Sequence, residues 1–142
     1  MVQSLRDITR NIYALTEQLL AASVPPLDIP RLAELRKLIG LARTQFYDEQ
    51  ERLLLQPLRA SGDPALAAIA RNCVDRDLEL RRLGMLHYQH WTLAKVAEDP
   101  EAYRSAMRHL LGLMDDRARF AEQFAYPALS RLISSAKQPT VS

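Results

Sequence analysis

The predicted fold is organised around the segment HLLGLMDDRARFAEQFAYPAL, residues 109–129. Its apolar residues recur at spacings of three, four and seven: Leu110, Met114, Ala121, Phe124 and Ala128. This spacing predicts one inward face of an amphipathic helix. Arg117 lies in the middle of that face. A guanidinium in this position needs a partner or a path to water, so the residues opposite Arg117 are the first candidates for a site.

The rest of the chain has the composition of a helical protein. It has 142 residues, the size of one domain, and only four are glycine. The net charge is +2, and no basic run is longer than two residues, as at Arg81 and Arg82. We therefore expect no nucleic-acid partner.

The cysteine count and the hydropathy pattern exclude several kinds of protein and site. Cys73 is the only cysteine, which excludes an internal disulfide and a cysteine-based zinc site and suggests a small buried apolar residue. The first ten residues, MVQSLRDITR, do not resemble a signal peptide. No apolar run approaches the ~20 residues that cross a bilayer. We therefore expect a cytoplasmic protein with no membrane contact.

Aspartate followed by proline marks the helix starts. Asp28, Asp63 and Asp99 are predicted N-caps, each with a proline in the first turn of its helix. The predicted helices span about 4–22, 28–59, 63–97 and 99–134, in one domain over 1–136 with a flexible tail at 137–142. The second helix is expected to bury Leu53 after Phe46. Short turns make neighbouring helices antiparallel, so we predict an all-α, up-down-up-down antiparallel four-helix bundle.

Counting residues outward from the turns places side chains in layers, because each helix rises ~1.5 Å per residue. Arg117 falls level with Tyr47 and with Asp77 or Leu80. A buried cluster of Arg117, Asp77 and Tyr47 follows as a prediction, since a carboxylate and a phenol would satisfy the guanidinium. The count has an error of about one turn, so Glu51 is an alternative to Asp77.

Three glycines fall at similar heights inside predicted helices: Gly40, Gly84 and Gly112. One interpretation is a small chamber, or a kink, beside a ligand. The other is close helix approach, or glycines that face outward. A glycine in a helix interior costs ~1 kcal/mol relative to alanine.

Two histidines share the predicted inner side of residues 63–97. His87 and His90 are three residues apart, and with Glu17 they are a candidate site for one metal ion. The alternative is a core histidine, His87, that forms a hydrogen bond with Thr16 or Glu17. No histidine follows a glutamate by three residues, so the ligand pattern of carboxylate-bridged di-metal bundles is missing. We predict no metal and no cofactor.

Two helix endings resemble those of the haemerythrin-like (HHE) family. They are FYDEQERLLLQPL at 46–58 and DDRARFAEQFAYPAL at 115–129, each an acidic stretch followed by apolar residues, proline and leucine. The segments LELRRLGMLHYQHW and DPEAYRSAMRHLL are also similar to that family. The resemblance covers nearly the whole chain and implies the haemerythrin-like bundle.

The resemblance also implies where a di-iron centre would lie. Its ligand positions fall on Tyr47 and Glu51 before Pro57, on Arg117 and Ala121 before Pro127, and near Asp77. Only Glu51 keeps a residue type that the family uses. We therefore interpret the chain as a metal-free relative, in which Arg117, Tyr47 and Asp77 occupy the place of the metals.

Three functions are compatible with these residues. The first is a non-enzymatic bundle that binds a protein partner or another copy of itself, in stress or redox regulation. The second is a sensor of a small ligand or metal that uses the bundle interior around His87, with His90 or Glu17, and the glycine layer. The third is an enzyme that uses Glu51, Tyr47 and Arg117 in acid–base chemistry.

Overall fold

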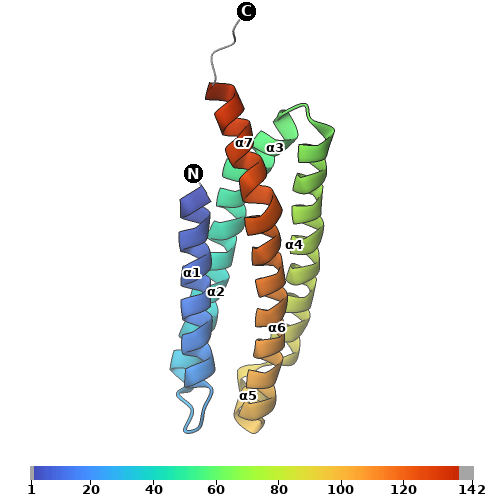
Figure 1. The fold of residues 1–142 in the computed structure, drawn as a ribbon. Coiled ribbons are helices and arrows are strands. Elements are labelled where there is room, and N and C mark those ends of the chain that lie inside the picture. Colours follow the sequence, from blue (N-terminus) through green and yellow to red (C-terminus); the bar gives the residue numbers. More distant parts are fainter. Residues whose placement is uncertain (1, 138–142) are drawn as a thin grey trace, which may run out of the picture.

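The computed structural model describes residues 2–137, and these residues form helices and short connections without a β-strand. The expected all-helical fold is confirmed. Figure 1 shows long helical segments lying side by side, with successive segments running in opposite directions. The C-terminal tail expected at 137–142 lies, apart from Lys137, outside the described residues.

The helices have the following bounds. The first hairpin consists of α1 (Val2–Ala22) and α2 (Ile29–Gln50), and α2 continues through the π-helical turn η1 (Glu51–Leu55) into α3 (Gln56–Ala60). The second contains α4 (Pro64–His90), the short α5 (Leu93–Glu98) and α6 (Pro100–Phe120), which continues through the π-helical turn η2 (Ala121–Ala125) into α7 (Tyr126–Lys137).

The three predicted aspartate caps are present. The carboxylate of Asp28 accepts a hydrogen bond from a backbone N–H at 3.1 Å, that of Asp63 at 2.8 Å and that of Asp99 at 3.1 Å. Each helix then has a proline in its first turn, where a missing N–H leaves no hydrogen bond unmade. These caps fix the starts of α2, α4 and α6.

The continuous helix predicted over 63–97 is wrong, because α4 ends at His90. Trp91 has a non-helical backbone (φ −93°, ψ 71°). Thr92 is extended and its hydroxyl accepts the N–H of Lys95 at 3.2 Å, which starts α5 as a separate helix. The predicted segment therefore contains a second capping residue that its apolar spacing did not reveal.

Both π-helical turns precede a proline, and both change which residues are buried. Pro57 and Pro127 lack an N–H, and a proline ring clashes with the carbonyl four residues earlier in an α-helix. A π-helical turn removes this conflict by bonding the preceding residue five positions back, as Gln56 does to Glu51 and Tyr126 to Ala121.

The extra residue in each turn shifts the inner face. Phe124, predicted to face inward, is 51% exposed, and Ala125 is buried instead. In the other turn Leu54 and Leu55 are buried, whereas Leu53, which we expected inside, is only partly buried. A regular 3.6-residue period does not account for these positions.

The apolar core is divided along the length of the molecule. One cluster contains Leu5, Leu58 and the buried thiol of Cys73, and it lies at the end of the molecule where α3 and α7 are found. A second cluster contains Leu35 and Tyr103 and lies at the opposite end, near α5. Only a small cluster lies between them: Ile8, Ile12 and Ala42. The middle of the interior therefore has the fewest buried apolar side chains of the three clusters.

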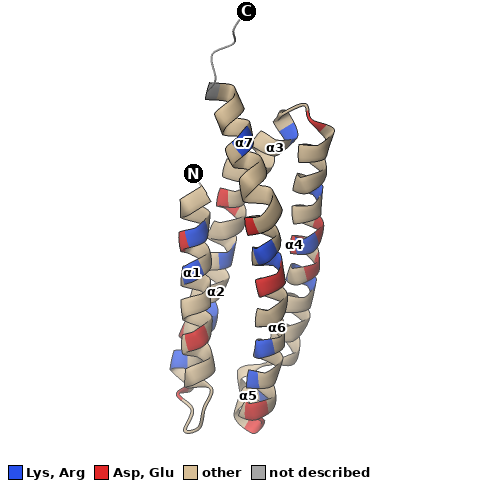
Figure 2. Ribbon diagram, viewed as in Figure 1, with Lys and Arg blue, Asp and Glu red and all other residues tan. Residues whose placement is uncertain are grey.

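Charge is distributed over all the long segments. Figure 2 shows basic and acidic residues interspersed along them rather than separated onto two faces. Within residues 2–137, no helix is both long enough and apolar enough to span a membrane.

Candidate functional site

Arg117 of α6 lies in a closed triangle of buried polar side chains with Asp77 of α4 and Gln50 of α2. Its Nε donates to Asp77 Oδ1 at 2.7 Å and its Nη2 to Asp77 Oδ2 at 3.3 Å. The same Nη2 donates to Gln50 Oε1 at 2.5 Å, and Gln50 Nε2 donates to Asp77 Oδ2 at 2.7 Å. The exposed fractions are 1% for Gln50, 6% for Asp77 and 7% for Arg117.

The electrostatics of the triangle keep Arg117 charged. Burial opposes the charge, but the facing carboxylate of Asp77 outweighs it and raises the pKa of Arg117. Buried polar groups that hydrogen-bond one another in this way lock the helices that carry them at one height. The triangle therefore fixes α2, α4 and α6 relative to one another.

Two residues expected in this cluster have other partners. Tyr47 is half-buried, and the guanidinium of Arg81 lies over its ring, 3.7 Å from the ring centre. Glu51 pairs with Arg59 at 2.6 Å, with both side chains 44% exposed. The acid–base set of Glu51, Tyr47 and Arg117 is therefore not assembled.

Gln50 takes the place predicted for Tyr47, and sequence reasoning missed it. It follows Phe46 by four residues and so lies on the predicted inner face, but we did not consider a polar residue there. An amide suits the position chemically, because it accepts from the cation and donates to the carboxylate at once.

Beside the triangle lies a hollow of about 640 Å³, here called the central hollow. All the long helical segments line it, and so do Asp77, Arg117 and Tyr47. Several lining residues, including Met85 and Arg81, are exposed, so the hollow opens to the surface. Its volume falls within the usual range for small-molecule sites.

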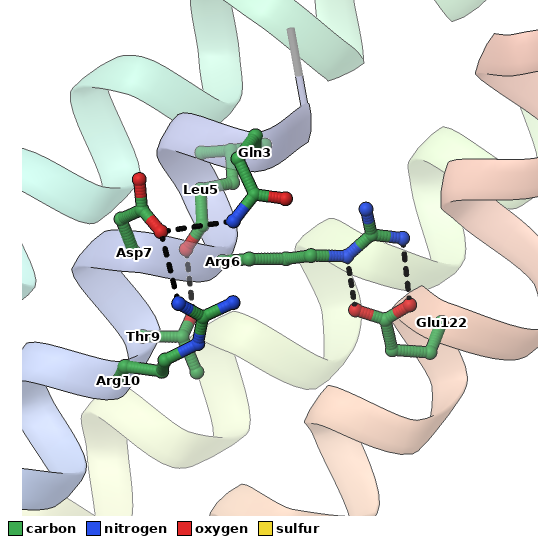
Figure 3. A network of polar contacts seen from close by, with 7 residues as sticks. All are labelled: Gln3, Leu5, Arg6, Asp7, Thr9, Arg10 and Glu122. Carbon is green, nitrogen blue, oxygen red and sulfur yellow. Dashed lines mark hydrogen bonds and ion pairs between the residues drawn. The ribbon is translucent and has the colours of Figure 1, made fainter.

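Hydrogen bonds tie α1 to α6 and η2 along one side of the central hollow. Arg6 donates from Nε and Nη2 to the two carboxylate oxygens of Glu122, at 2.8 and 2.9 Å (Figure 3). This hydrogen bonding lowers the pKa of Glu122. Farther along, the hydroxyl of Tyr13 donates to Asp115 at 2.5 Å, and burial together with this bond raises the pKa of Tyr13.

The side between α2 and α4 has a different chemistry. Arg81 lies over Tyr47, and Arg36 of α2 lies over the ring of Tyr88 of α4, 4.2 Å from the ring centre. Arg43 donates to the sulfur of Met114 at 3.4 Å, and burial lowers its pKa. Among residues 2–137, none of these three arginines has a carboxylate within 4.0 Å. Cations without acidic partners therefore collect along this side.

The three glycines do not form one layer. Gly40 and Gly84 line the central hollow, and a Cβ on Gly84 would come within 3.4 Å of Arg43 Nη1. Gly112 is exposed and does not line it. The expected chamber thus involves two of the three, because the side of α6 that carries Gly112 faces away.

The three predicted metal ligands are not brought together. His87 is half-buried and stacks on Tyr103 at 5.5 Å, whereas His90 and Glu17 are exposed. Thr16, a predicted partner of His87, instead donates to the carbonyl of Ile12. No group of three or more histidine, cysteine, aspartate or glutamate side chains is placed to share a metal ion in the part of the chain that the structure describes.

His87 has a strongly altered acidity. Burial, together with the nearby charges of Arg36 and Arg43, lowers the pKa of His87 to about 4. The imidazole is therefore neutral at pH 7. It lines a smaller pocket of about 130 Å³, here called the side pocket, which adjoins the central hollow and shares Gly40, Arg43 and Gly84 with it.

Comparison with known proteins gives no further assignment. No family model, no curated protein and no solved structure matches this chain.

Proposed function

We propose that this chain is a non-enzymatic protein that binds a small, largely apolar molecule inside a helical bundle. The central hollow carries the proposal: about 640 Å³ of space lined by all the long helical segments. Native interiors are close-packed, so a space of this size in the middle of a small domain favours a ligand.

The architecture proposed with it is an up-down-up-down four-helix bundle of the haemerythrin-like type that lacks the di-iron ligands. The antiparallel order of the long segments supports this arrangement. The positions that would hold iron carry Arg117, Asp77 and Tyr47, and the first two form an ion pair. In this proposal the cation substitutes for metal charge, and the space beside it serves for binding.

The test is a fluorescence titration with N-phenylnaphthylamine, a neutral dye that brightens in apolar surroundings. The expected result is saturable binding of one dye per chain, which Gly40→Leu weakens about tenfold, equivalent to about 1.4 kcal/mol. Gly40 lines the hollow, and no atom lies within 4 Å of its added Cβ, so the variant occupies space without a clash there.

Gly112→Leu is the matched control. Its Cβ also meets nothing within 4 Å, and Gly112 is exposed and lies outside the hollow. Both variants replace a helical glycine and gain the same helix propensity. Absence of saturable dye binding, or equal effects of the two substitutions, would refute the proposal.

A partner-binding role in regulation is the second candidate. Four large apolar side chains of α4 are each about half exposed: Leu78, Met85, Leu86 and Tyr88. Several large apolar side chains exposed on one helix are typical of an interaction surface. Sedimentation velocity of the wild-type chain and of Leu78→Glu tests self-association through this helix. A concentration-dependent dimer that the glutamate abolishes supports it, and a wild-type monomer at all concentrations rejects self-association.

A further inference from the structure

Arg36 is a buried cation with an unmet hydrogen bond. Only 9% of its surface is exposed, and it lines the side pocket. Its Nη1 has no hydrogen-bond partner, and among the described side chains of residues 2–136 it is the one buried nitrogen or oxygen of which this is true. A buried donor without a hydrogen-bond partner is destabilising, and more so when it is charged. Nη1 of Arg36 is thus an open donor for a molecule in the pocket.

The surroundings of Arg36 supply positive charge and no acid. Arg43 lies where the side pocket meets the central hollow. It donates a hydrogen bond to the sulfur of Met114, which is a weak acceptor. α1 contributes Thr16, whose hydroxyl already donates to a carbonyl, and α6 contributes Tyr103 and Met107. His87 from α4 is neutral at pH 7. Two guanidiniums therefore face a pocket with no acidic residue in its lining.

We infer that the side pocket binds the carboxylate of an amphipathic ligand whose apolar body lies in the central hollow. Guanidinium groups bind carboxylates through paired, charge-assisted hydrogen bonds. A carboxylate is compact enough for about 130 Å³, whereas the adjoining 640 Å³ accommodates an apolar chain or ring. This inference rests on the proposed function and adds the chemical class of the ligand.

The experiment compares decanoate with decanol, which share a chain and differ in the head group. Each displaces N-phenylnaphthylamine from the wild-type chain at pH 7.5, below the micelle concentration of decanoate and below the solubility limit of decanol. We expect decanoate to bind at least about tenfold more tightly than decanol, because only the carboxylate forms charge-assisted hydrogen bonds with the guanidinium. Arg36→Met should abolish the preference for decanoate over decanol.

Lys37→Met is the matched control, since Lys37 is the next residue and is exposed. It removes the same charge and should leave the preference for decanoate intact. Arg36→Lys keeps the charge but loses the planar fork, so an intermediate preference is expected. Arg36→Met removes a buried cation that has no carboxylate partner, and it also removes the contact of that cation with the Tyr88 ring. These two effects oppose each other, so the thermal midpoint of the variant should stay close to that of wild type.

The outcomes separate the two proposals. If decanol and the dye bind but decanoate binds no better, or if Arg36→Met and Lys37→Met act alike, the carboxylate site is wrong and the hollow remains. If neither the dye nor decanol binds, the proposed function itself is wrong.

Discussion

Replacement of Arg117 by methionine tests the triangle most directly. The substitution leaves Asp77, 6% exposed, with one hydrogen bond from Gln50 and without its two from Arg117. Two charge-assisted bonds contribute about 3–6 kcal/mol, and breaking a buried ion pair typically costs 3–5 kcal/mol. Because Asp77 also lines the central hollow, water can reach it. We therefore expect Arg117→Met to lower the free energy of unfolding by about 3 kcal/mol, the low end of that range.

The assay is urea unfolding at pH 7. The double variant Asp77→Leu/Arg117→Met should regain most of the lost free energy of unfolding, since an apolar pair leaves no charge unpaired. A loss below about 1 kcal/mol for the single variant, or no recovery in the double variant, would refute the account of a buried pair.

Two further predictions concern single contacts. His87 has a pKa of about 4 in the folded chain against 6.5 ordinarily, so the unfolded chain binds its proton first and stability falls as the pH drops from 6.5 to 4. Because His87 is only half-buried, we expect a loss of about 1–2 kcal/mol over that window; His87→Phe should lack it, and an equal loss in the variant would disprove the assignment. Arg6 and Glu122 are 36% and 48% exposed, so Arg6→Met should cost no more than about 1 kcal/mol in urea unfolding, and less in high salt. A larger or salt-independent loss would show that this bridge closes the hollow more tightly than its exposure indicates.

Local sequence signals predicted most of the helical layout. Asp28, Asp63 and Asp99 mark helix starts by chemistry that depends on a few neighbouring residues, and all three act as caps. Thr92 has the same role but was missed, because the apolar spacing continues across it. Capping signals thus placed helix starts well, whereas apolar periodicity hid a break.

The candidate site was predictable only in part. Arg117 and Asp77 were found because a charge on an apolar face needs a partner at the same height. Gln50, Arg36 and Arg43 were not found, since a glutamine or arginine near an inner face looks like any other surface residue. Whether such a residue is buried depends on the separation of α2 and α4, which no local pattern encodes.

The π-helical turn at Glu51–Leu55 makes the triangle sensitive to chain length at a distance from its own residues. A π-helical turn is an α-helix with one residue inserted. Deleting one residue from this turn would restore the α-helix and rotate everything before it by about 100° relative to α3. Gln50 would then turn away from Asp77, although neither residue had changed. A single-residue deletion in this stretch would therefore rotate α2 about its axis. Different side chains of α2 would then face the interior, although no residue had been substituted.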